Sequence, residues 1–258
     1  MNVSDQALEP IVIYHKAIRN LRKRQDLNSQ DIFGQQSILL SLLVLLVSAV
    51  VSGSSDFRTI FGLIETCLHS LNGEEGILHG ELGTFIIRQI RKYRGYVSPL
   101  LGPGQGVRRL SQSVAKPYTS DGWEDISVNC QLYPHFENAW SIIYALNEQA
   151  CNIYVSRALA NPGSPSRIDL VTEFINTLKR LPPDSPGLYM VPWTIFLVAA
   201  EAPEPDQRQF LEGVLLNHYK RNGFANLPVA LRFLQKVWSN QTYWNWAQAL
   251  TELPVFVV

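Results

Sequence analysis

Apolar residues recur at helical spacing along almost the whole chain, and this pattern constrains the fold more than any other feature. Apolar side chains at i, i+3, i+4 and i+7 line one face of an α-helix. The spacing is clearest from Phe57 to Leu71 and from Ile168 to Leu181, where Pro182 and Pro183 end the second stripe. Strand-like alternation is nearly absent from the sequence. We therefore expect an all-α fold.

The same spacing predicts helices elsewhere in the chain, over residues 38–51, 82–93, 136–154, 188–202, 206–221 and 227–238. A further stripe near the start consists of Ala7, Ile11, Tyr14, Ile18 and Leu21, and a polar run over residues 22–31 follows it. No repeat of fixed period is visible. These features favour an irregular multi-helix bundle of antiparallel helices around one core, as a single domain over residues 1–258.

The stretch near residues 98–129 carries few apolar residues, and we expect it to be an irregular loop. It contains a G-x-G-x-G run at Gly102, Gly104 and Gly106. That run follows no strand and includes Pro103, so it favours a flexible surface loop over a phosphate-binding turn.

One apolar run, Ile38 to Val51, resembles part of a membrane span in composition. Its 14 residues fall short of the ~20 that a helix needs to cross a bilayer. We therefore expect a helix that is buried on all sides and makes no membrane contact. The N-terminus, with Asp5 and Glu9, does not fit a signal peptide.

The charge balance disfavours a dedicated nucleic-acid-binding domain. The chain has 22 Lys and Arg residues against 22 Asp and Glu residues, so no positive surplus is left to neutralise phosphates. Two local basic clusters remain, the first formed by Arg19, Arg22, Lys23 and Arg24 and the second by Arg88, Arg91, Lys92 and Arg94. The first fits a helix C-terminus or a nuclear import signal. We expect the second to be a solvated helix face, with contact to an acidic partner or nucleic acid as the alternative.

No catalytic, cofactor-binding or metal-binding motif is recognisable. The sequence lacks a phosphate-binding loop of the G-x-x-x-x-G-K-[ST] type, a G-x-S-x-G turn and an H-E-x-x-H pair. The cysteines, Cys67, Cys130 and Cys151, match no zinc-ligand spacing, and Cys130 with His135 makes no ligand set by itself. We expect buried structural cysteines, no cofactor, and no catalytic, cofactor-binding or metal-binding residues.

The five histidines, which are His15, His69, His79, His135 and His218, have no neighbours that mark a catalytic base. We expect each to be an ordinary helical or loop residue. His15 lies at the edge of the first apolar stripe, so it is the histidine best placed to line a pocket.

Residues 192–238 run from a Trp-containing apolar helix ending in Glu-Ala, through an Arg and a Gly/Asn turn, to a Val-Trp pair. The positions are Trp193, Glu201, Ala202, Arg208, Gly223, Asn226, Val237 and Trp238. This order resembles the last part of the fungal-specific regulatory domain of binuclear zinc-cluster transcription factors. Residues 7–24, 85–102 and 150–159 are similar to earlier segments of that domain, so the resemblance covers nearly the whole chain. We expect Trp193 and Trp238 to be buried.

The sequence departs from the family pattern at several points. Thr194 stands where a Pro commonly follows the Trp, and Ala199 stands where a Gly is usual. The six-cysteine zinc cluster of the family is absent, and three scattered cysteines cannot supply it. A fragment, a mis-split gene model and a protein that lost its DNA-binding module all fit this departure.

The resemblance implies a regulatory or partner-binding domain of a fungal transcription regulator, located in the nucleus and without its own DNA-binding zinc cluster. It implies no enzyme. Protein coregulators or a small-molecule effector are the expected partners, with a homodimer as a further state and DNA contacted only through a module absent from this chain. The competing hypotheses are an all-α enzyme or small-molecule-binding protein with a pocket between helices, and a helical scaffold without a regulatory role.

Overall fold

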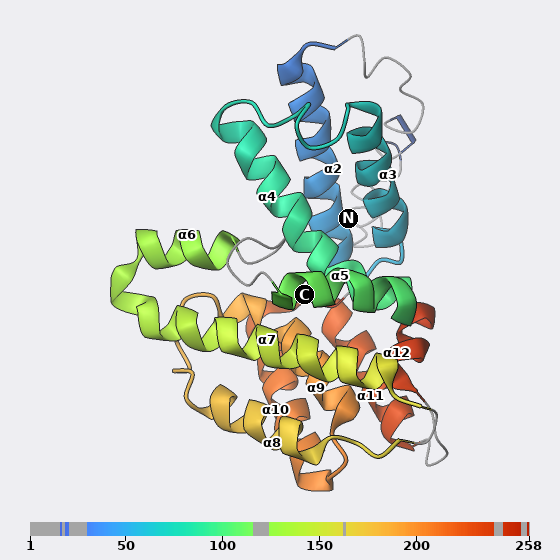
Figure 1. The fold of residues 1–258 in the computed structure, drawn as a ribbon, viewed down its shortest axis with the longest axis vertical. Coiled ribbons are helices and arrows are strands. Elements are labelled where there is room, and N and C mark those ends of the chain that lie inside the picture. Colours follow the sequence, from blue (N-terminus) through green and yellow to red (C-terminus); the bar gives the residue numbers. More distant parts are fainter. Residues whose placement is uncertain are drawn as a thin grey trace, which may run out of the picture. The chain divides into compact units, whose positions relative to one another are not determined.

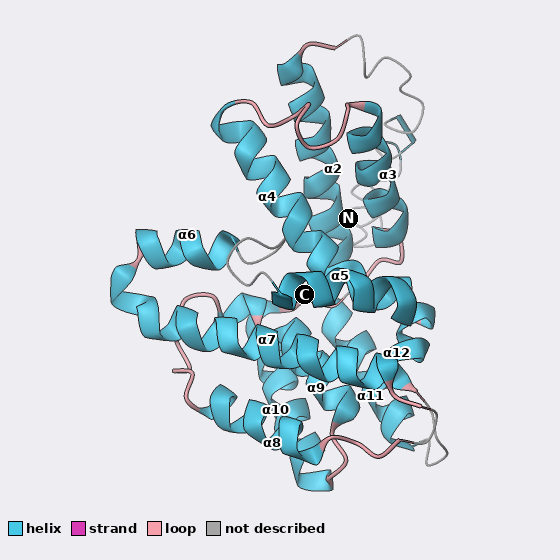
Figure 2. Ribbon diagram, in the orientation of Figure 1, coloured by secondary structure: helices cyan, strands magenta, loops and turns pink. Residues whose placement is uncertain are grey.

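The computed structural model describes residues 30–115, 124–161, 164–239 and 245–253, together with Lys16, Arg19, Asn20 and Val257. Eleven α-helices, α2 to α12, and four short 3-10 helices occur among these residues, and no strand does (Figures 1 and 2). The all-α prediction is therefore confirmed.

The chain divides into two compact units. Unit 1 comprises residues 1–49 and 55–90, and unit 2 comprises residues 50–54 and 91–258. The boundaries fall within helix α2 (Ile32–Ser52) and helix α4 (Gly80–Val97). A single domain over residues 1–258 stays a prediction.

Unit 1 contains most of α2, helix α3 (Phe57–Ser70) and the first part of α4. The buried face of α3 is the stripe that the sequence predicted, consisting of Phe57, Ile60, Phe61, Ile64, Cys67 and Leu68. The buried side-chain amide of Gln36, on α2, donates to the carbonyl oxygens of Ile77 and His79 at 3.1 and 2.8 Å. These bonds hold the turn before α4 against α2.

Helix α2 is longer than the sequence predicted. It begins at Ile32 rather than Ile38, because the Asp31 carboxylate accepts a hydrogen bond from the Gly34 N–H at 2.8 Å and caps the first turn. The resulting 21 residues are long and apolar enough to cross a bilayer, although core helices pass the same test and 44% of the most apolar window is buried. The argument from a short length is wrong, and so is the expected burial on all sides, because Val44 and Val47 are 62% and 43% exposed. The absence of membrane contact stays a prediction.

Unit 2 is built around α9 (Pro192–Glu201), a helix whose residues are all buried. A helix that is apolar on every side needs neighbours on every side. The helices packed against it are α7 (Glu137–Leu159), α8 (Ile168–Lys179), α10 (Pro205–Asn222) and α11 (Asn226–Ser239). The short 3-10 helix η4 (Leu188–Met190) precedes α9, and α12 (Trp246–Ala249) and η5 (Leu250–Glu252) follow α11.

The expected loop near residues 98–129 is helical wherever it is described. It forms the 3-10 helix η2 (Ser98–Leu101), α5 (Pro103–Ala115) and α6 (Glu124–Leu132), and residues 116–123 lie outside the described ones. A second 3-10 helix, η3 (Pro134–Phe136), connects α6 to α7. The loop prediction is wrong because Pro103 begins α5 rather than breaking it, at a position where a missing N–H costs no helical hydrogen bond.

Gly106 lies inside α5 at the contact with α7. A Cβ atom there would clash with the Tyr154 hydroxyl and lie 2.7 Å from the carbonyl oxygen of Ser98. Tyr154 is fully buried on α7, and burial raises the pKa of its hydroxyl, which therefore stays protonated at neutral pH. The glycine run is thus a packing feature: residue 106 must lack a side chain for α5 to approach α7.

We predict that Gly106→Ala destabilises the chain and that Gly104→Ala, in the same helix, does not. A Cβ at Gly104 meets no atom within 4 Å. Overpacking at residue 106 should cost roughly 1–3 kcal/mol, whereas alanine at residue 104 should stabilise by up to about 1 kcal/mol. Urea unfolding measures both changes, and equal shifts of the two midpoints would contradict the close contact at Gly106.

Candidate functional site

Several of the positions that carried the resemblance lie at or against the two ends of α9. Trp193 lies in its first turn, is buried as predicted, and donates its indole N–H to the Tyr96 carbonyl oxygen at 3.0 Å. Glu201 is the last residue of α9, and Arg208 and Trp238 lie on α10 and α11. The candidate site is therefore the C-terminal end of α9 and its surroundings.

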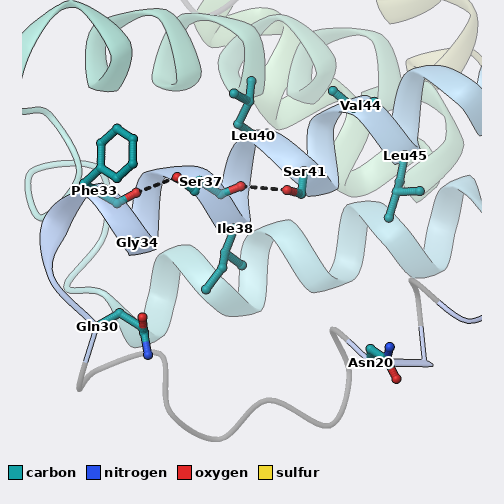
Figure 3. A pocket seen from close by; sticks show the side chains of 10 residues that line it. All are labelled: Asn20, Gln30, Phe33, Gly34, Ser37, Ile38, Leu40, Ser41, Val44 and Leu45. Atoms are coloured by element: carbon teal, nitrogen blue, oxygen red, sulfur yellow. Dashed lines mark hydrogen bonds between the residues drawn. The ribbon is translucent and has the colours of Figure 1, made fainter.

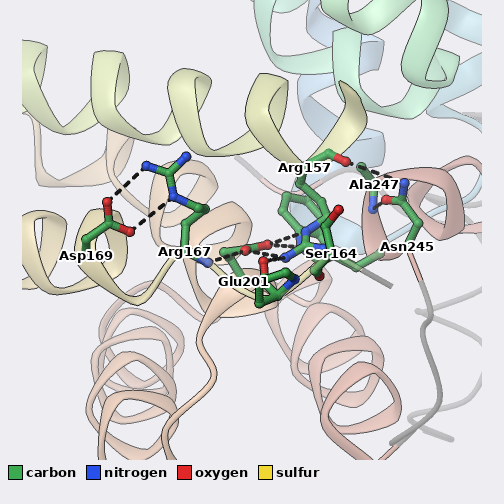
Figure 4. A network of polar contacts seen from close by, with 9 residues as sticks. Arg157, Ser164, Arg167, Asp169, Glu201, Asn245 and Ala247 are labelled. Atoms are coloured by element: carbon green, nitrogen blue, oxygen red, sulfur yellow. Dashed lines mark hydrogen bonds and ion pairs between the residues drawn. The ribbon is translucent and has the colours of Figure 1, made fainter. Parts of the chain in front are cut away.

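Glu201 presents a buried carboxylate, 2% exposed, to four hydrogen-bond donors (Figure 4). Arg157, on α7, donates from Nε to Oε2 at 2.8 Å and from Nη2 to Oε1 at 2.5 Å. The backbone N–H of Arg167 donates to Oε1 at 2.9 Å, and the indole N–H of Trp246 donates to Oε2 at 2.7 Å. Each carboxylate oxygen thus accepts two hydrogen bonds.

Arg157 is held from a second side. Its guanidinium also donates to the carbonyl oxygens of Ser164 and Pro165 at 2.9 and 3.2 Å. A planar guanidinium that meets a carboxylate through two N–H groups is a strong, directional pair. The Glu201 network therefore joins α7, the segment before α8, α9 and α12.

Trp246 reaches this network because its helix is capped. The side-chain oxygen of Asn245 accepts a hydrogen bond from the backbone N–H of Ala247 at 3.1 Å and begins α12. The cap fixes the direction of the indole that follows.

The arrangement is structural rather than catalytic. A general acid or base must exchange a proton with a substrate. Both oxygens of Glu201 are occupied by protein donors, and the side chain is closed to solvent. The network binds helices together and offers no reacting atom.

The last carbonyl groups of α9 are capped by side chains from α10 and α11. The indole N–H of Trp238 donates to the Ala199 carbonyl oxygen at 2.8 Å, and Nε of Arg208 donates to the Ala202 carbonyl oxygen at 2.8 Å. The Arg208 guanidinium carbon lies 5.8 Å from the centre of the Trp238 ring. These bonds satisfy groups that a helix end leaves without intrahelical partners.

Trp238 is only half-buried, so the prediction of its full burial is wrong. Its indole N–H donates to α9 and its ring contacts the Arg208 guanidinium, so Trp238 lies at the edge of the core.

The Gly/Asn turn of the resemblance ends α10. Gly223 has a φ of 69°, in the left-handed region, and its N–H donates to the Tyr219 carbonyl oxygen at 2.8 Å. The next turn bonds to the end of α2, where the Ala225 N–H donates to the Val51 carbonyl oxygen at 2.9 Å. Asn226 is fully buried beside this contact.

Sequence reasoning missed the partners of Glu201. Arg157 and Trp246 are 44 and 45 residues away from it along the chain. No local pattern marks either residue as a partner of Glu201, although Arg157 lies in a segment, residues 150–159, that carried part of the resemblance.

The histidines do not form a common site among the described residues. His69, His79 and His135 are exposed, and His15 lies outside the described residues. His218 is buried on α10, where burial and the nearby Arg221 lower its pKa.

The cysteines have no reactive setting. Cys67 and Cys151 are buried, as predicted, whereas Cys130 is half-buried. Burial raises the pKa of Cys151 to about 12, so the thiol stays protonated at neutral pH and is a poor nucleophile. Within the described ranges, no three His, Cys, Asp or Glu residues come together as metal ligands.

The second basic cluster is not a solvated face, so that prediction is wrong. Lys92 is buried, with Nζ 5.6 Å from the centre of the Tyr189 ring, and the Arg88 guanidinium lies 5.8 Å from the Phe85 ring. Arg91 and Arg94 are half-buried. In the first cluster, Arg22, Lys23 and Arg24 lie outside the described residues.

An open hollow of about 870 Å³ runs along α2 in unit 1 (Figure 3). Its lining consists of Asn20, Gln30, Phe33, Gly34, Ser37, Ile38, Leu40, Ser41, Val44 and Leu45. None of these side chains is ionisable, so this lining offers no acid or base to an enzyme.

Residues 112–255 match a protein family described as the fungal specific transcription factor domain. The chain belongs to this family. The match covers more than half of the chain and includes the whole Glu201 network. It confirms the resemblance stated for the C-terminal part and identifies a regulatory rather than an enzymatic family.

The match leaves residues 1–111 outside, so the similarities at residues 7–24 and 85–102 stay predictions. No significant match was found among curated proteins or among solved structures.

We predict that Glu201→Ala strongly destabilises the domain, whereas Asp169→Ala has little effect. The first change leaves the buried Arg157 cation without its carboxylate, which costs about 3–5 kcal/mol. Asp169 pairs with Arg167 at 2.9 Å, but both side chains are exposed, so solvent screens the pair. Comparable unfolding midpoints for the two variants would show that the Glu201 network does not stabilise unit 2.

We predict that His218 makes the domain less stable as the pH falls. Its pKa in the folded chain is lower than the ordinary value of 6.5, so below that value the unfolded chain binds the proton more readily. Stability attributable to His218 is present above pH 6.5 and declines as the pH falls through the lowered pKa. Urea unfolding at pH 7.5 and 5.5 should show a smaller loss for His218→Gln than for the unchanged chain, and an identical loss would exclude this residue as a source.

Proposed function

We propose that this chain is the regulatory and partner-binding part of a fungal transcription regulator that acts in the nucleus. It carries no DNA-binding zinc cluster of its own, and DNA is contacted through a separate module. It is not an enzyme. The observation that carries the proposal is the family match over residues 112–255, which contains the network that holds unit 2 together.

The charge and cysteine content supports the assignment of DNA recognition to another module. Specific reading of DNA needs base contacts from a module that fits a groove, together with positive charge for the phosphates. This chain has a net charge of zero and three cysteines, of which two are buried. Nothing in this set resembles the six-cysteine cluster of the family.

A protein coregulator is favoured over a small effector by an apolar turn between α6 and α7. Leu132, Tyr133 and Phe136 are all exposed, and no residue from 131 to 138 is buried. The His135 ring lies 4.2 Å from that of Phe136 and 6.5 Å from that of Tyr133, centre to centre. Exposed clustered aromatic residues are typical of surfaces that bind an apolar segment of another protein.

The test joins the full chain to an unrelated DNA-binding domain and measures a reporter gene in fungal cells. The fusion should change reporter output. Replacing Leu132 and Tyr133 by serine should weaken coregulator binding roughly tenfold, which corresponds to about 1.4 kcal/mol, and reduce the reporter change. The control is Leu159→Ser, since Leu159 is also exposed but lies at the far end of α7.

The outcomes separate the parts of the proposal. Because all three substituted residues are exposed, each variant should fold and accumulate as the unchanged fusion does. No reporter change from an abundant, folded fusion would contradict the regulatory role. Serine variants that change reporter output as much as the unchanged fusion does would contradict only the assignment of coregulator binding to the apolar turn. Tight sequence-specific DNA binding by the unfused chain would contradict the assignment of DNA recognition to another module.

A further inference from the structure

The connection between α7 and α8 carries a serine that is followed by a proline and, three residues on, by an arginine. The four residues are Ser164, Pro165, Ser166 and Arg167. Ser164 is half-buried, and the other three are exposed. None of them belongs to a helix, since α8 begins at Ile168. Unit 2 therefore presents a partly accessible serine in a short irregular stretch of chain.

This order of residues is typical of a substrate for a proline-directed protein kinase. The proline biases the preceding serine toward an extended backbone and offers no N–H group, which suits an enzyme that binds an extended peptide. The Arg167 side chain, which is 50% exposed, provides a cation three residues after Ser164. Ser166 has no proline after it.

The structure distinguishes Ser164 from the other serines that precede a proline. These are Ser98 and Ser185, and both are buried. The residue three positions after each of them is a leucine, Leu101 or Leu188, rather than a basic residue. Accessibility and the basic residue therefore coincide at Ser164 alone among the three Ser-Pro pairs of the sequence.

The backbone of this connection is bound to the Arg157–Glu201 pair (Figure 4). Nη1 of Arg157 donates to the Ser164 carbonyl oxygen at 2.9 Å, and Nη2 donates to the Pro165 carbonyl oxygen at 3.2 Å. The Arg167 N–H donates to Oε1 of Glu201 at 2.9 Å. A charge added to Ser164 thus lies next to the cation that neutralises the buried carboxylate.

A phosphate on Ser164 would compete with Glu201 for that cation. Phosphoserine carries about −1.5 to −2 charges at neutral pH and has three strong acceptor oxygens. The Arg157 side chain is 10% exposed, so solvent and salt screen the competition only weakly. Within the described residues, four of the five N–H groups of Arg157 already donate, two of them to Glu201. A guanidinium shared between two anions neutralises the buried carboxylate less well, which weakens the network.

We propose that Ser164 is a phosphorylation site for a proline-directed kinase and that its phosphate loosens the Glu201 network. The Ser164 hydroxyl oxygen attacks the γ-phosphorus of a nucleoside triphosphate that the kinase supplies. A new Oγ–phosphorus bond forms and the bond to the bridging oxygen breaks. The nucleoside diphosphate leaves, and the hydroxyl proton passes to a base of the kinase. This inference goes beyond the proposed function, because it concerns how unit 2 is held together rather than what it binds.

The first experiment measures whether the folded full chain accepts phosphate at Ser164. The chain is incubated with ATP and a purified kinase that prefers serine, proline, any residue and a basic residue in that order, and mass spectrometry locates the phosphate. We expect phosphate on Ser164, none at that position in Ser164→Ala, and roughly tenfold slower transfer in Pro165→Ala. The matched control Ser166→Ala should leave the rate unchanged. Far-ultraviolet circular dichroism checks that each variant folds.

The second experiment measures amide hydrogen exchange in the chain with and without the phosphate. We expect exchange in the peptide that contains α12 to rise roughly tenfold, because Trp246 is held there by Glu201. Exchange in α3, which belongs to unit 1, should not change and serves as the control within the same molecule. Ser164→Ala treated with the same kinase controls for phosphate at other positions.

Each outcome decides one part of the proposal. A folded chain without phosphate on Ser164 would overturn the modification site, as would transfer to Ser98 or Ser185 at the same rate. Unchanged or slower exchange in α12 of the phosphorylated chain would overturn the loosening of the network. Because the purified chain is used without a coregulator or a reporter gene, either failure is distinguishable from a failure of the proposed function.

Discussion

The burial of the Glu201 carboxylate at the end of an apolar helix imposes a requirement on the rest of unit 2, since a buried charge must be paired and hydrogen-bonded. The donors come from Arg157 on α7, from the backbone before α8 and from Trp246 on α12. Each donor must be held in direction as well as in distance. The packing of α7, α8 and α12 around α9 is the arrangement that delivers them together.

Hydrophobic burial alone would leave the position of α9 poorly defined, because its surface is apolar on every side. The polar contacts at its C-terminal end fix the position of α9 relative to the helices around it. Trp238 and Arg208 donate hydrogen bonds to the last carbonyl groups of α9. The Glu201 carboxylate accepts hydrogen bonds from three other parts of unit 2. The short Trp, Glu-Ala, Arg and Val-Trp pattern of the sequence therefore corresponds to the groups that fix one helix among its neighbours.

Local periodicity predicted the helices well where one face is buried, as in α3 and α8, because burial and sequence spacing then share one period. It failed around Pro103 and Gly106. Glycine and proline both disfavour helix interiors. Here Pro103 begins α5, and Gly106 lets α5 approach Tyr154. The Glu201 partners could not be predicted from sequence for another reason. Tertiary packing brings them together, and Arg157 and Trp246 are each more than 40 residues from Glu201 along the chain.

The order of the donors along the chain has a consequence for folding during synthesis. Arg157 and Arg167 are made before Glu201, but Trp246 follows it by 45 residues. At about 5–20 residues per second, the ribosome takes roughly 2–9 s to add the 45 residues from Glu201 to Trp246. During that interval the nascent chain has α7, α8 and an apolar α9 with an incompletely satisfied carboxylate, whereas α10, α11 and α12 are still to come. We therefore expect the Glu201 network to close only after translation has passed α12.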